Sequence, residues 1–434
     1  MSSNLLTFGV HRLRPDGELM MEGLPLNHIA ARFGTPCFVY SKAALVGAYQ
    51  RLDDALRIAR GGRPYLICYA VKANSNLAVL ALFAKLGAGF DIVSGGELMR
   101  VLKAGGDPGK VVFSGLGKTV AEMRMALEAN IKCFNVESES ELERLNEVAT
   151  RFGSKARISL RVNPDVDAKT HPYISTGLKN NKFGIAIERA MAVYRRAVLL
   201  SHIQVVGVDC HIGSQLTDDA PLQEAMGRIV ALADALAREG VVVDHVCPGG
   251  GLGITYKDET AIDLNSYARA LQASLGDRKV ELLLEPGRIL VGNAGVLLSR
   301  VEYVKPTDSK SFLVIDAAMN DLIRPALYQA HHEVVMAGCP RTDTTTAIYD
   351  VVGPVCESAD VLAHARALAA CEGDVVAILS AGAYSFAMSS NYNSRPRAAE
   401  VLVDGDYAVV VRERESFDDL VRLERLQSNV AELD

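Results

Sequence analysis

The sequence predicts an α/β protein: a (β/α)8 TIM-like barrel plus a mostly antiparallel β domain. Between residues 65 and 287, short apolar runs alternate with segments that carry apolar residues at helical spacing, the pattern of repeated βα units. After about residue 296 the apolar runs follow one another with little helix between them, which indicates antiparallel β structure. The 434 residues leave room for a barrel of about 250 residues and a second domain.

Eight apolar runs are the expected barrel strands. They cover residues 65–71, 90–94, 111–114, 133–136, 157–163, 205–213, 243–248 and 281–287. Segments between them, such as residues 75–87, 138–153 and 222–240, have helical periodicity and end in glycine, a common helix C-cap. A doubly wound open sheet would show the same alternation, so periodicity alone leaves both folds open.

Polar residues directly after these strands favour the barrel, because barrel enzymes place their active sites at the carboxyl ends of the strands. The polar and glycine residues at or just past the strand ends are Lys72, Asp91, Ser94, Arg161, Asn163, His211, Gly249, Gly250, Gly251 and Glu285. Each one alone could be an ordinary loop or cap residue. So many at equivalent positions indicate one shared site.

The change in pattern also predicts the domain boundaries. We expect the barrel over residues 36–287 and the β domain from residues 1–35 and 288–434. Strands of the β domain are expected within residues 296–304, 311–319, 346–355, 374–384 and 400–411. Residues 13–23 have a polar turn between two short runs, so we expect this segment to pair with the β domain.

Composition narrows the class of protein. The formal net charge of −6 contains no basic block, which argues against nucleic acid or an anionic membrane as a partner. No apolar stretch reaches the ~18 residues of a membrane span, and the first residues do not resemble a signal peptide. The eight cysteines show no CxxC pair and no zinc-like spacing. We therefore expect a cytoplasmic protein without a metal site, in which most cysteines are core residues.

Lys72 ends the apolar run of the first barrel strand (LICYAVKANSN, residues 66–76). A lysine at a strand end often only extends its ammonium group to the solvent. A desolvated lysine, however, has a lowered pKa and forms Schiff bases with aldehydes. Consecutive glycines at 249–251 expose N–H groups suited to an anion, and Glu285 adds a carboxylate. A lysine, an anion site and a carboxylate are what pyridoxal phosphate requires.

Several motifs resemble the pyridoxal-phosphate-dependent decarboxylases that share the alanine racemase-like fold. They are YAVKAN (69–74), FDIVSGGE (90–97), HIGSQ (211–215), GGGLG (249–253), EPGR (285–288), GPVCES (353–358) and GAY (382–384). TGLKNNKFGI (176–185) and AAMNDLIRPALYQAHHEV (317–334) resemble the branch of this family that acts on diaminopimelate. The resemblance implies decarboxylation of meso-diaminopimelate to L-lysine and CO2, the last step of lysine biosynthesis by the diaminopimelate route.

The resemblance also implies roles for residues around the cofactor. Lys72 would carry pyridoxal phosphate, and His211 would stack on one face of its pyridine ring. Glu285 would contact the ring nitrogen and keep it protonated, which favours decarboxylation. The other cofactor contacts that the resemblance implies are Asp91, Arg161, Ser214, Gly249, Gly250, Gly251 and Tyr384.

A homodimer with an active site shared between subunits is a further implication of the resemblance. Each subunit would lend Cys356 and Glu357 to the other's site, Cys356 as the catalytic proton donor and Glu357 as the ligand of the substrate's distal ammonium group. Arginines suit a distal carboxylate because a guanidinium group grips it with two hydrogen bonds. The substrate-binding residues expected are Arg288, Arg324, Tyr328, Glu357 and Tyr384.

Cys247 departs from the family pattern. The family usually has an acidic residue two positions before the triple glycine, whereas this chain has Cys247 there, followed by Pro248. The departure puts in doubt any hydrogen bond that this acid makes at the end of the seventh strand. It leaves the glycine backbone unaffected.

Decarboxylases of ornithine, arginine or carboxynorspermidine are the nearest alternatives. An ornithine decarboxylase is expected to have an acidic residue directly after the tyrosine, where this chain has Gln329. Arg324 and Gln329 argue against the first two substrates and less against carboxynorspermidine. A non-catalytic relative that binds partners is the alternative from another class. Lys72, Glu285 and Cys356 argue against it, because a binding protein needs neither an electron sink nor a proton donor.

Overall fold

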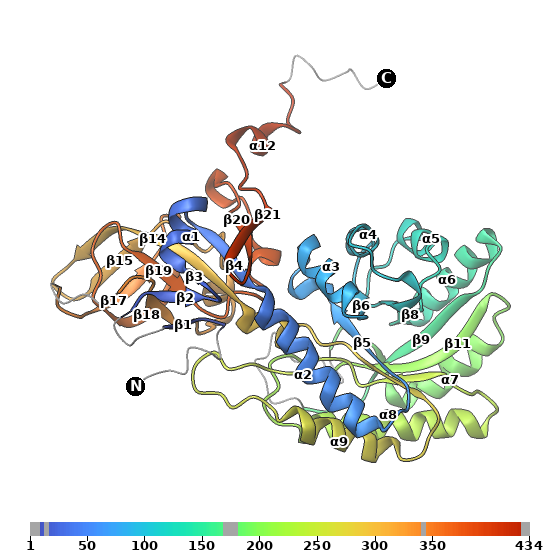
Figure 1. The fold of residues 1–434 in the computed structure, drawn as a ribbon. Helices are drawn as coiled ribbons and strands as arrows, with labels where there is room; N and C mark the ends of the chain where they lie inside the picture. Colours follow the sequence, from blue (N-terminus) through green and yellow to red (C-terminus); the bar gives the residue numbers. More distant parts are fainter. Residues whose placement is uncertain (1–8, 13–16, 168–180, 340–343, 427–434) are drawn as a thin grey trace. The chain divides into compact units, whose positions relative to one another are not determined.

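The computed structural model describes residues 9–12, 17–167, 181–339 and 344–426 (Figure 1). They form two compact units, one drawn from Met1–Lys42 and Gly295–Asp434 and the other from Ala43–Ala294. Two parts of the expected motifs lie outside the described residues: 176–180 of the TGLKNNKFGI motif and 13–16 of the N-terminal segment.

The unit Ala43–Ala294 is built on a closed parallel barrel. Its strands are β5 (Tyr65–Ala70), β6 (Gly89–Ile92), β7 (Val111–Phe113), β8 (Cys133–Val136), β9 (Ala156–Asn163), β11 (Ile203–Cys210), β12 (His245–Cys247) and β13 (Glu281–Leu284). Every neighbouring pair is parallel, and β13 pairs with β5 to close the ring. An open doubly wound sheet would leave edge strands unpaired, so the closure confirms the predicted barrel. The short strand β10 (Ile185–Ala186) pairs with the end of β9.

Helices connect the barrel strands, as the alternation predicts. They are α2 (Lys42–Arg60), α3 (Leu77–Lys85), α4 (Gly95–Lys103), α5 (Val120–Glu128), α6 (Glu139–Phe152), α7 (Ile187–Val198), α8 (Ala220–Arg238), α9 (Leu264–Leu275) and α10 (Arg288–Val291), with short 3-10 turns η2 (Val71–Ala73), η3 (Pro108–Lys110) and η5 (Gly292–Ala294). Among the described residues, no helix has the length and apolar character needed to cross a membrane.

Local sequence explains where several helices begin and end. The side chains of Asn76, Ser94, Thr119 and Ser138 each accept an N–H hydrogen bond from the first turn of the following helix. Helix α6 ends at Gly153, whose φ of 75° is the left-handed conformation that favours glycine. These caps place each helix start just after a strand end, which keeps the intervening loops short.

Apolar side chains fill part of the barrel interior. Residues from β5, β7, β8, β11, β12 and β13 form one buried cluster, namely Cys68, Val112, Cys133, Val206, Cys247 and Leu283. Toward the carboxyl ends of the strands, polar residues lie next to this cluster. Asp209 of β11 lies opposite Arg161 of β9 and Cys247 of β12. The apolar floor therefore supports a polar layer near the carboxyl ends of the strands.

The other unit is a mostly antiparallel sheet. Its strands run in the order β18 (Val361–Leu368), β17 (Ala347–Val352), β15 (Ser311–Ile315), β14 (Gly295–Pro306), β4 (Cys37–Ser41), β20 (Ala399–Asp404) and β21 (Tyr407–Arg412), with β19 (Val375–Ile378) pairing with β14 and β16 (Val334–Met336). Only the β15–β17 and β4–β20 pairs are parallel. The antiparallel character of the second domain is confirmed.

Shorter elements complete this unit. They are β1 (His11–Arg12), β2 (Leu19–Met21) and β3 (Leu24–Pro25), which form a small sheet, with α1 (Leu26–Phe33), α11 (Arg324–Tyr328), α12 (Phe417–Val421), η6 (Phe386–Met388) and η7 (Tyr392–Ser394). Strand β4 lies between β14 and β20, so both of its edges are paired within the antiparallel sheet. The compact unit therefore extends past the expected boundary at residue 36, because an apolar run alone does not reveal which sheet a strand joins.

Candidate active site

Lys72 and Asp91 form an ion pair at the carboxyl ends of β5 and β6. The Nζ atom of Lys72 lies 3.1 Å from Oδ2 of Asp91. Asp91 is fully buried, whereas the Lys72 side chain keeps 40% of its exposure. Lys72 stands in the 3-10 turn that follows β5, so the ammonium group projects past the strand toward the mouth of the barrel. The other oxygen of Asp91, Oδ1, accepts no hydrogen bond within the described residues.

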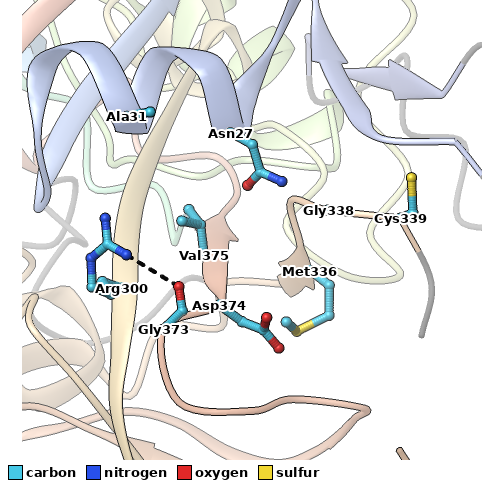
Figure 2. A pocket seen from close by; sticks show the side chains of 9 residues that line it. All are labelled: Asn27, Ala31, Arg300, Met336, Gly338, Cys339, Gly373, Asp374 and Val375. Carbon is cyan, nitrogen blue, oxygen red and sulfur yellow. Dashed lines mark hydrogen bonds between the residues drawn. The ribbon is translucent and has the colours of Figure 1, made fainter. Parts of the chain in front are cut away.

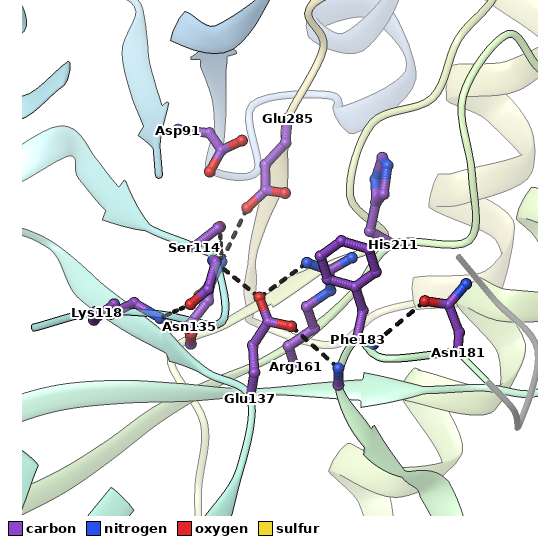
Figure 3. A network of polar contacts seen from close by, with 12 residues as sticks. Asp91, Ser114, Lys118, Asn135, Glu137, Arg161, Asn181, Phe183, His211 and Glu285 are labelled. Carbon is purple, nitrogen blue, oxygen red and sulfur yellow. Dashed lines mark hydrogen bonds and ion pairs between the residues drawn. The ribbon is translucent and has the colours of Figure 1, made fainter. Parts of the chain in front are cut away.

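Glu285 follows β13 and is held by an amide from β8. The Nδ2 atom of Asn135 donates to Oε1 of Glu285 over 3.0 Å and to Oγ of Ser114 over 3.1 Å (Figure 3). Burial raises the pKa of Glu285 well above its ordinary value, and the negative charges of Asp209 and Asp91 add to this effect. The positive charges of Lys72 and Arg161 oppose it. Glu285 thus favours the protonated form more than an exposed glutamate does.

Arg161 of β9 is fixed by a second buried carboxylate. Its guanidinium group lies 3.1 Å from Oε1 of Glu137, and its centre is 4.8 Å from the ring of Phe183 (Figure 3). Glu137 also accepts the backbone N–H groups of Gly115 and Gly184, over 2.9 and 3.1 Å. A carboxylate that accepts from three donors is strongly held. Glu137 therefore fixes the orientation of the Arg161 guanidinium group.

His211 is a neutral imidazole in the loop after β11. Its Nδ1 atom accepts the backbone N–H of Gly250 over 3.2 Å. Because a backbone N–H can only donate, Nδ1 carries no proton, and the ring proton lies on Nε2. Burial lowers the pKa of His211 well below its ordinary value, and the positive charges of Arg161 and Lys72 lower it further. An uncharged ring is suited to stacking.

The triple glycine passes too close to other backbone to carry side chains. A Cβ atom on Gly250 would lie 1.9 Å from the carbonyl oxygen of Glu285, and one on Gly251 would lie 2.4 Å from that of Gly213. Gly249 and Gly251 also have φ angles of 81° and 98°, in the region that favours glycine. The N–H groups of Gly249 and Gly250 donate to Cys247 Sγ and to His211. The N–H of Gly251 is the third backbone donor of this run, and such a run of N–H groups is suited to an anion.

Arg288 lies beside the glycine loop and contacts two residues. One of them, Ser214, was assigned to the cofactor from the sequence, and the other, Tyr256, was not singled out. Its guanidinium group donates to Oγ of Ser214 over 2.9 Å and to the hydroxyl of Tyr256 over 2.6 Å. Arg288 is nearly buried at the start of α10. Ser214 was expected at the cofactor phosphate and Arg288 at the substrate, yet the two are in direct contact.

The remaining expected substrate residues lie in the antiparallel unit. Arg324 begins α11 and is buried, with its NH1 atom 2.8 Å from Nε2 of His332. His332 Nδ1 lies 2.8 Å from the carbonyl oxygen of Leu379, which can only accept, so Nδ1 holds the proton and Nε2 accepts from Arg324. Tyr328 ends the same helix. His332 thus aims the guanidinium group of Arg324.

Cys356, Glu357 and Tyr384 also belong to the antiparallel unit. Cys356 is exposed, and its backbone N–H donates to Oδ1 of Asn393 over 2.9 Å. Glu357 is exposed in the turn after Cys356. Tyr384 has a φ of 55°, an unusual conformation for a residue with a side chain. Backbone strain of this kind is typical of functional positions.

A family model and many relatives match this chain. The model described as "Pyridoxal-dependent decarboxylase, pyridoxal binding domain" matches residues 43–292. The diaminopimelate decarboxylase of Pseudomonas aeruginosa is 59% identical over 95% of this chain and 98% of its own length.

This chain belongs to the diaminopimelate decarboxylase family.

Other members and solved structures agree. The diaminopimelate decarboxylase of Vibrio cholerae is 56% identical over 94% of this chain and 97% of its own. Among solved structures, the m. jannaschii diaminopimelate decarboxylase in complex with L-lysine has a TM-score of 0.91 and 40% identity, over 96% of this chain and 98% of the other. The Helicobacter pylori enzyme complexed with L-lysine has a TM-score of 0.88 and 42% identity, over 92% and 99%. The resemblance drawn from the motifs is confirmed.

Asn135, Glu137 and Tyr256 contact the expected site residues but were missed in the sequence. Asn135 and Glu137 lie at the end of the run CFNVE, where two polar side chains follow an apolar strand. The same rule that selected Asp91 and Arg161 would have selected them. Tyr256 lies in a loop well after β12, and no local pattern in the sequence marks it.

A cavity of about 230 Å³ in the antiparallel unit has none of the expected site residues in its lining (Figure 2). It is lined by Asn27, Ala31, Arg300, Met336, Gly338, Cys339, Gly373, Asp374 and Val375. Arg300 donates to the carbonyl oxygen of Gly373 over 3.2 Å at its edge. None of these residues belongs to the barrel unit.

Proposed function

We propose that this chain removes CO2 from meso-diaminopimelate and releases L-lysine, with pyridoxal phosphate as cofactor. The observation that carries the proposal is the polar layer at the barrel mouth, where the Lys72–Asp91 pair and buried Glu285 act on one another electrostatically. Relatives that are more than half identical over almost the whole chain are named diaminopimelate decarboxylases. Both lines of support converge on one reaction class.

The barrel residues fit pyridoxal phosphate. Lys72 offers an ammonium group at the mouth, and the unpartnered Oδ1 of buried Asp91 leaves an acceptor for a further donor. The glycine run makes a turn without room for side chains, beside the hydroxyl of Ser214 and the cation of Arg288. We assign the phosphate to this corner, the covalent attachment to Lys72, and the ring nitrogen to Glu285. Bound in this way, the cofactor would accept the electron pair that CO2 leaves behind.

The surrounding residues prepare these three groups. Asn135 holds the carboxyl group of Glu285 in place, and Glu137 holds Arg161 beside it. Asp91 keeps Lys72 extended toward the barrel mouth. We assign to His211, neutral through its bond from Gly250, the stacking contact with the cofactor ring. Each group is therefore oriented before any ligand arrives, which lowers the cost of binding.

Substrate choice rests on charge. Diaminopimelate has an ammonium and a carboxylate group at both ends, so its distal end needs a cation and an anion. Arg324, oriented by His332, offers two-pronged hydrogen bonding to the distal carboxylate together with Tyr328. Glu357 would take the distal ammonium group, and Gln329 supplies no acid of the kind that ornithine would need.

A homodimer completes the proposal. Cys356 and Glu357 are exposed on the antiparallel unit. We assign them to the active site of the partner subunit, with Cys356 as the donor that returns a proton to the reacting carbon. A two-fold assembly would then contain two such sites. We place the reaction in the cytoplasm, as the sequence composition suggests.

The test is CO2 release by the purified protein loaded with pyridoxal phosphate. Meso-diaminopimelate is compared with L-ornithine, L-arginine and carboxynorspermidine at equal concentration. Strong preference for diaminopimelate supports the proposal. Preference for another amine would overturn the assignment of Arg324 and Glu357 but keep the cofactor. If the cofactor is bound but no CO2 is released from any of the four compounds, the enzymatic function is overturned and a partner-binding relative is favoured.

A further inference from the structure

Asp209 is a buried carboxyl group in the polar layer for which neither the sequence nor the family roles gave a purpose. It lies on β11, is 1% exposed, and neither of its oxygens accepts a hydrogen bond within the described residues. One oxygen of Asp209, one of Glu285 and Sγ of Cys247 all lie within 4.8 Å of one another. An ionised carboxylate in such a place would lack water and would face no donor stronger than the Cys247 thiol, which is a costly state.

Two carboxyl groups this close do not ionise together, because each negative charge opposes the other. Burial raises the pKa of Asp209 to about 7, and the negative charges of Asp91 and Glu137 add to the rise. Arg161 and Cys247 oppose it. The charged and titratable groups that face the pair from the surrounding strands and loops are Lys72, Cys68, Asp91, Cys133, Glu137, Arg161, Cys210 and Cys247.

A metal ion is the other way to satisfy an Asp, Cys and Glu cluster, and the surroundings oppose it. Arg161 lies opposite Asp209 in the strand register, and its positive charge acts on Asp209, so it repels a further cation. Burial raises the pKa of the Cys247 thiol, and Glu285 and Asp209 raise it further, so the thiolate form that a metal requires is disfavoured. Glu285 is also already bonded by Asn135. The cluster is therefore suited to a proton.

We propose that Asp209 is a positioning residue that shares one proton with Glu285 and keeps the Glu285 carboxyl protonated at neutral pH, ready to give that proton to the ring nitrogen of pyridoxal phosphate. In this transfer the O–H bond of Glu285 breaks and an N–H bond forms, which leaves one negative charge on Glu285 and one positive charge on the ring. Asp209 acts only through Glu285. The inference rests on the proposed function insofar as it needs the cofactor ring at Glu285.

Cys247 has a place in the same arrangement. An acid at that position would bring a further negative charge to the pair, because Cys247 lies opposite Asp209 on the neighbouring strand. The thiol is neutral and small, so Asp209 and Glu285 are the carboxyl groups that divide the proton between them. This relates the departure from the family pattern at Cys247 to the presence of Asp209.

Infrared spectroscopy of the cofactor-free full-length protein tests the shared proton directly. The C=O band of a protonated buried carboxyl is followed from pH 5 to pH 9 in wild type, Asp209→Asn, Glu285→Gln and, as a matched control, Asp321→Asn. Asp321 is another buried carboxyl with an unpartnered oxygen, but it lies in the antiparallel unit. Other buried carboxyls, such as Glu97 and Asp321, also have raised pKa values. We therefore expect the difference spectrum between wild type and Glu285→Gln to contain a band that persists above pH 7. In Asp209→Asn its midpoint moves down by one pH unit or more, and the control leaves the midpoint unchanged.

An unchanged midpoint in Asp209→Asn, or no protonated band in wild type, would overturn the inference. If Asp209→Asn does not fold, the same infrared midpoint is measured in Cys247→Asp. A third carboxyl must move this midpoint upward if the proton is shared. Stoichiometric metal in the purified protein would likewise overturn it. In the loaded protein, the nitrogen-15 signal of labelled cofactor should lose its ring proton at a lower pH in Asp209→Asn. The infrared result does not depend on any substrate, so it separates this inference from failure of the proposed reaction.

Discussion

The Lys72 ammonium group and the Asp91 carboxylate are 3.1 Å apart, and only the lysine is reached by solvent. A buried charge that loses its partner is strongly destabilised, whereas the exposed partner is rehydrated. The pair therefore holds a reactive lysine at the barrel mouth from a fixed anchor on the neighbouring strand. It also explains why a lysine ends the apolar run of β5.

Substitutions of Lys72 and Asp91 should separate two roles: Lys72 attaches the cofactor, and Asp91 holds Lys72 in place. We expect Lys72→Ala to lose the visible absorbance of bound cofactor and to lower activity by about 10³-fold or more. Asp91→Asn should keep part of the absorbance but lower kcat/KM by roughly 10²-fold, because the lysine loses its charged partner. Lys42→Ala breaks the exposed Lys42–Asp404 pair and serves as the control, with activity close to wild type. Full activity in Asp91→Asn would contradict the anchoring role.

Asn135 should matter through Glu285. We expect Glu285→Gln to lower kcat by about 10²-fold to 10³-fold. Asn135→Ala removes the amide that donates to Glu285 over 3.0 Å and should lower kcat by roughly 10-fold. Because the two residues act as one unit, the double variant should be no worse than Glu285→Gln. Steady-state kinetics of the three variants check this, and strictly additive losses would show that Asn135 acts elsewhere.

Gly250→Ala should damage the glycine loop. The new Cβ atom would lie 1.9 Å from the carbonyl oxygen of Glu285, so the backbone must shift, at a cost of about 1–3 kcal/mol or more. Gly227→Ala is the matched control, because it stands exposed within α8 with nothing within 4 Å of the added atom. Removing a helical glycine should stabilise the fold by about 0.5–1 kcal/mol. Urea unfolding compares the two, and equal effects would be incompatible with the close approach.

The barrel should lose stability in acid through His245. Burial, aided by the positive charges of Lys132 and Arg157, lowers the pKa of His245 to about 3 from its ordinary 6.5. The group therefore stabilises the fold above pH 6.5, and this contribution is lost as pH falls toward 3, by about 1.4 kcal/mol per pH unit. Urea midpoints measured at several pH values in this window should fall less steeply in His245→Gln. Exposed His28→Gln is the control, and a slope in His245→Gln equal to that of wild type would refute the prediction.

Two inactive variants should restore activity when mixed. Lys72→Ala and Cys356→Ala remove different halves of the proposed shared site. After random subunit exchange, half of the dimers contain one copy of each variant and one intact site, so we expect about one quarter of wild-type activity. CO2 release before and after exchange is the measurement. A mixture that stays inactive, despite exchange shown by differently tagged subunits, would rule out a shared site.

Much of the barrel site was accessible from the sequence because its signals are local. An apolar run that stops at a polar residue marks the end of a buried strand, and this rule selected Lys72, Asp91, Arg161 and Glu285. Strand ends of a parallel barrel all face one mouth, so the same rule predicted that these residues meet. Family motifs then added the residues of the antiparallel unit, which local pattern alone would not have connected to them.

The sequence by itself determined the alternation of strands and helices, the residues at the strand ends and, through its motifs, the family. Only the tertiary structure decided that the strands close into a ring, that β4 joins the antiparallel sheet, and that Asn135 reaches Glu285 across 150 residues of chain. The difference has a physical cause. Periodicity reports which face of a single element is buried, whereas the pairing of Asp209 with its neighbours depends on register between strands, which no local pattern encodes.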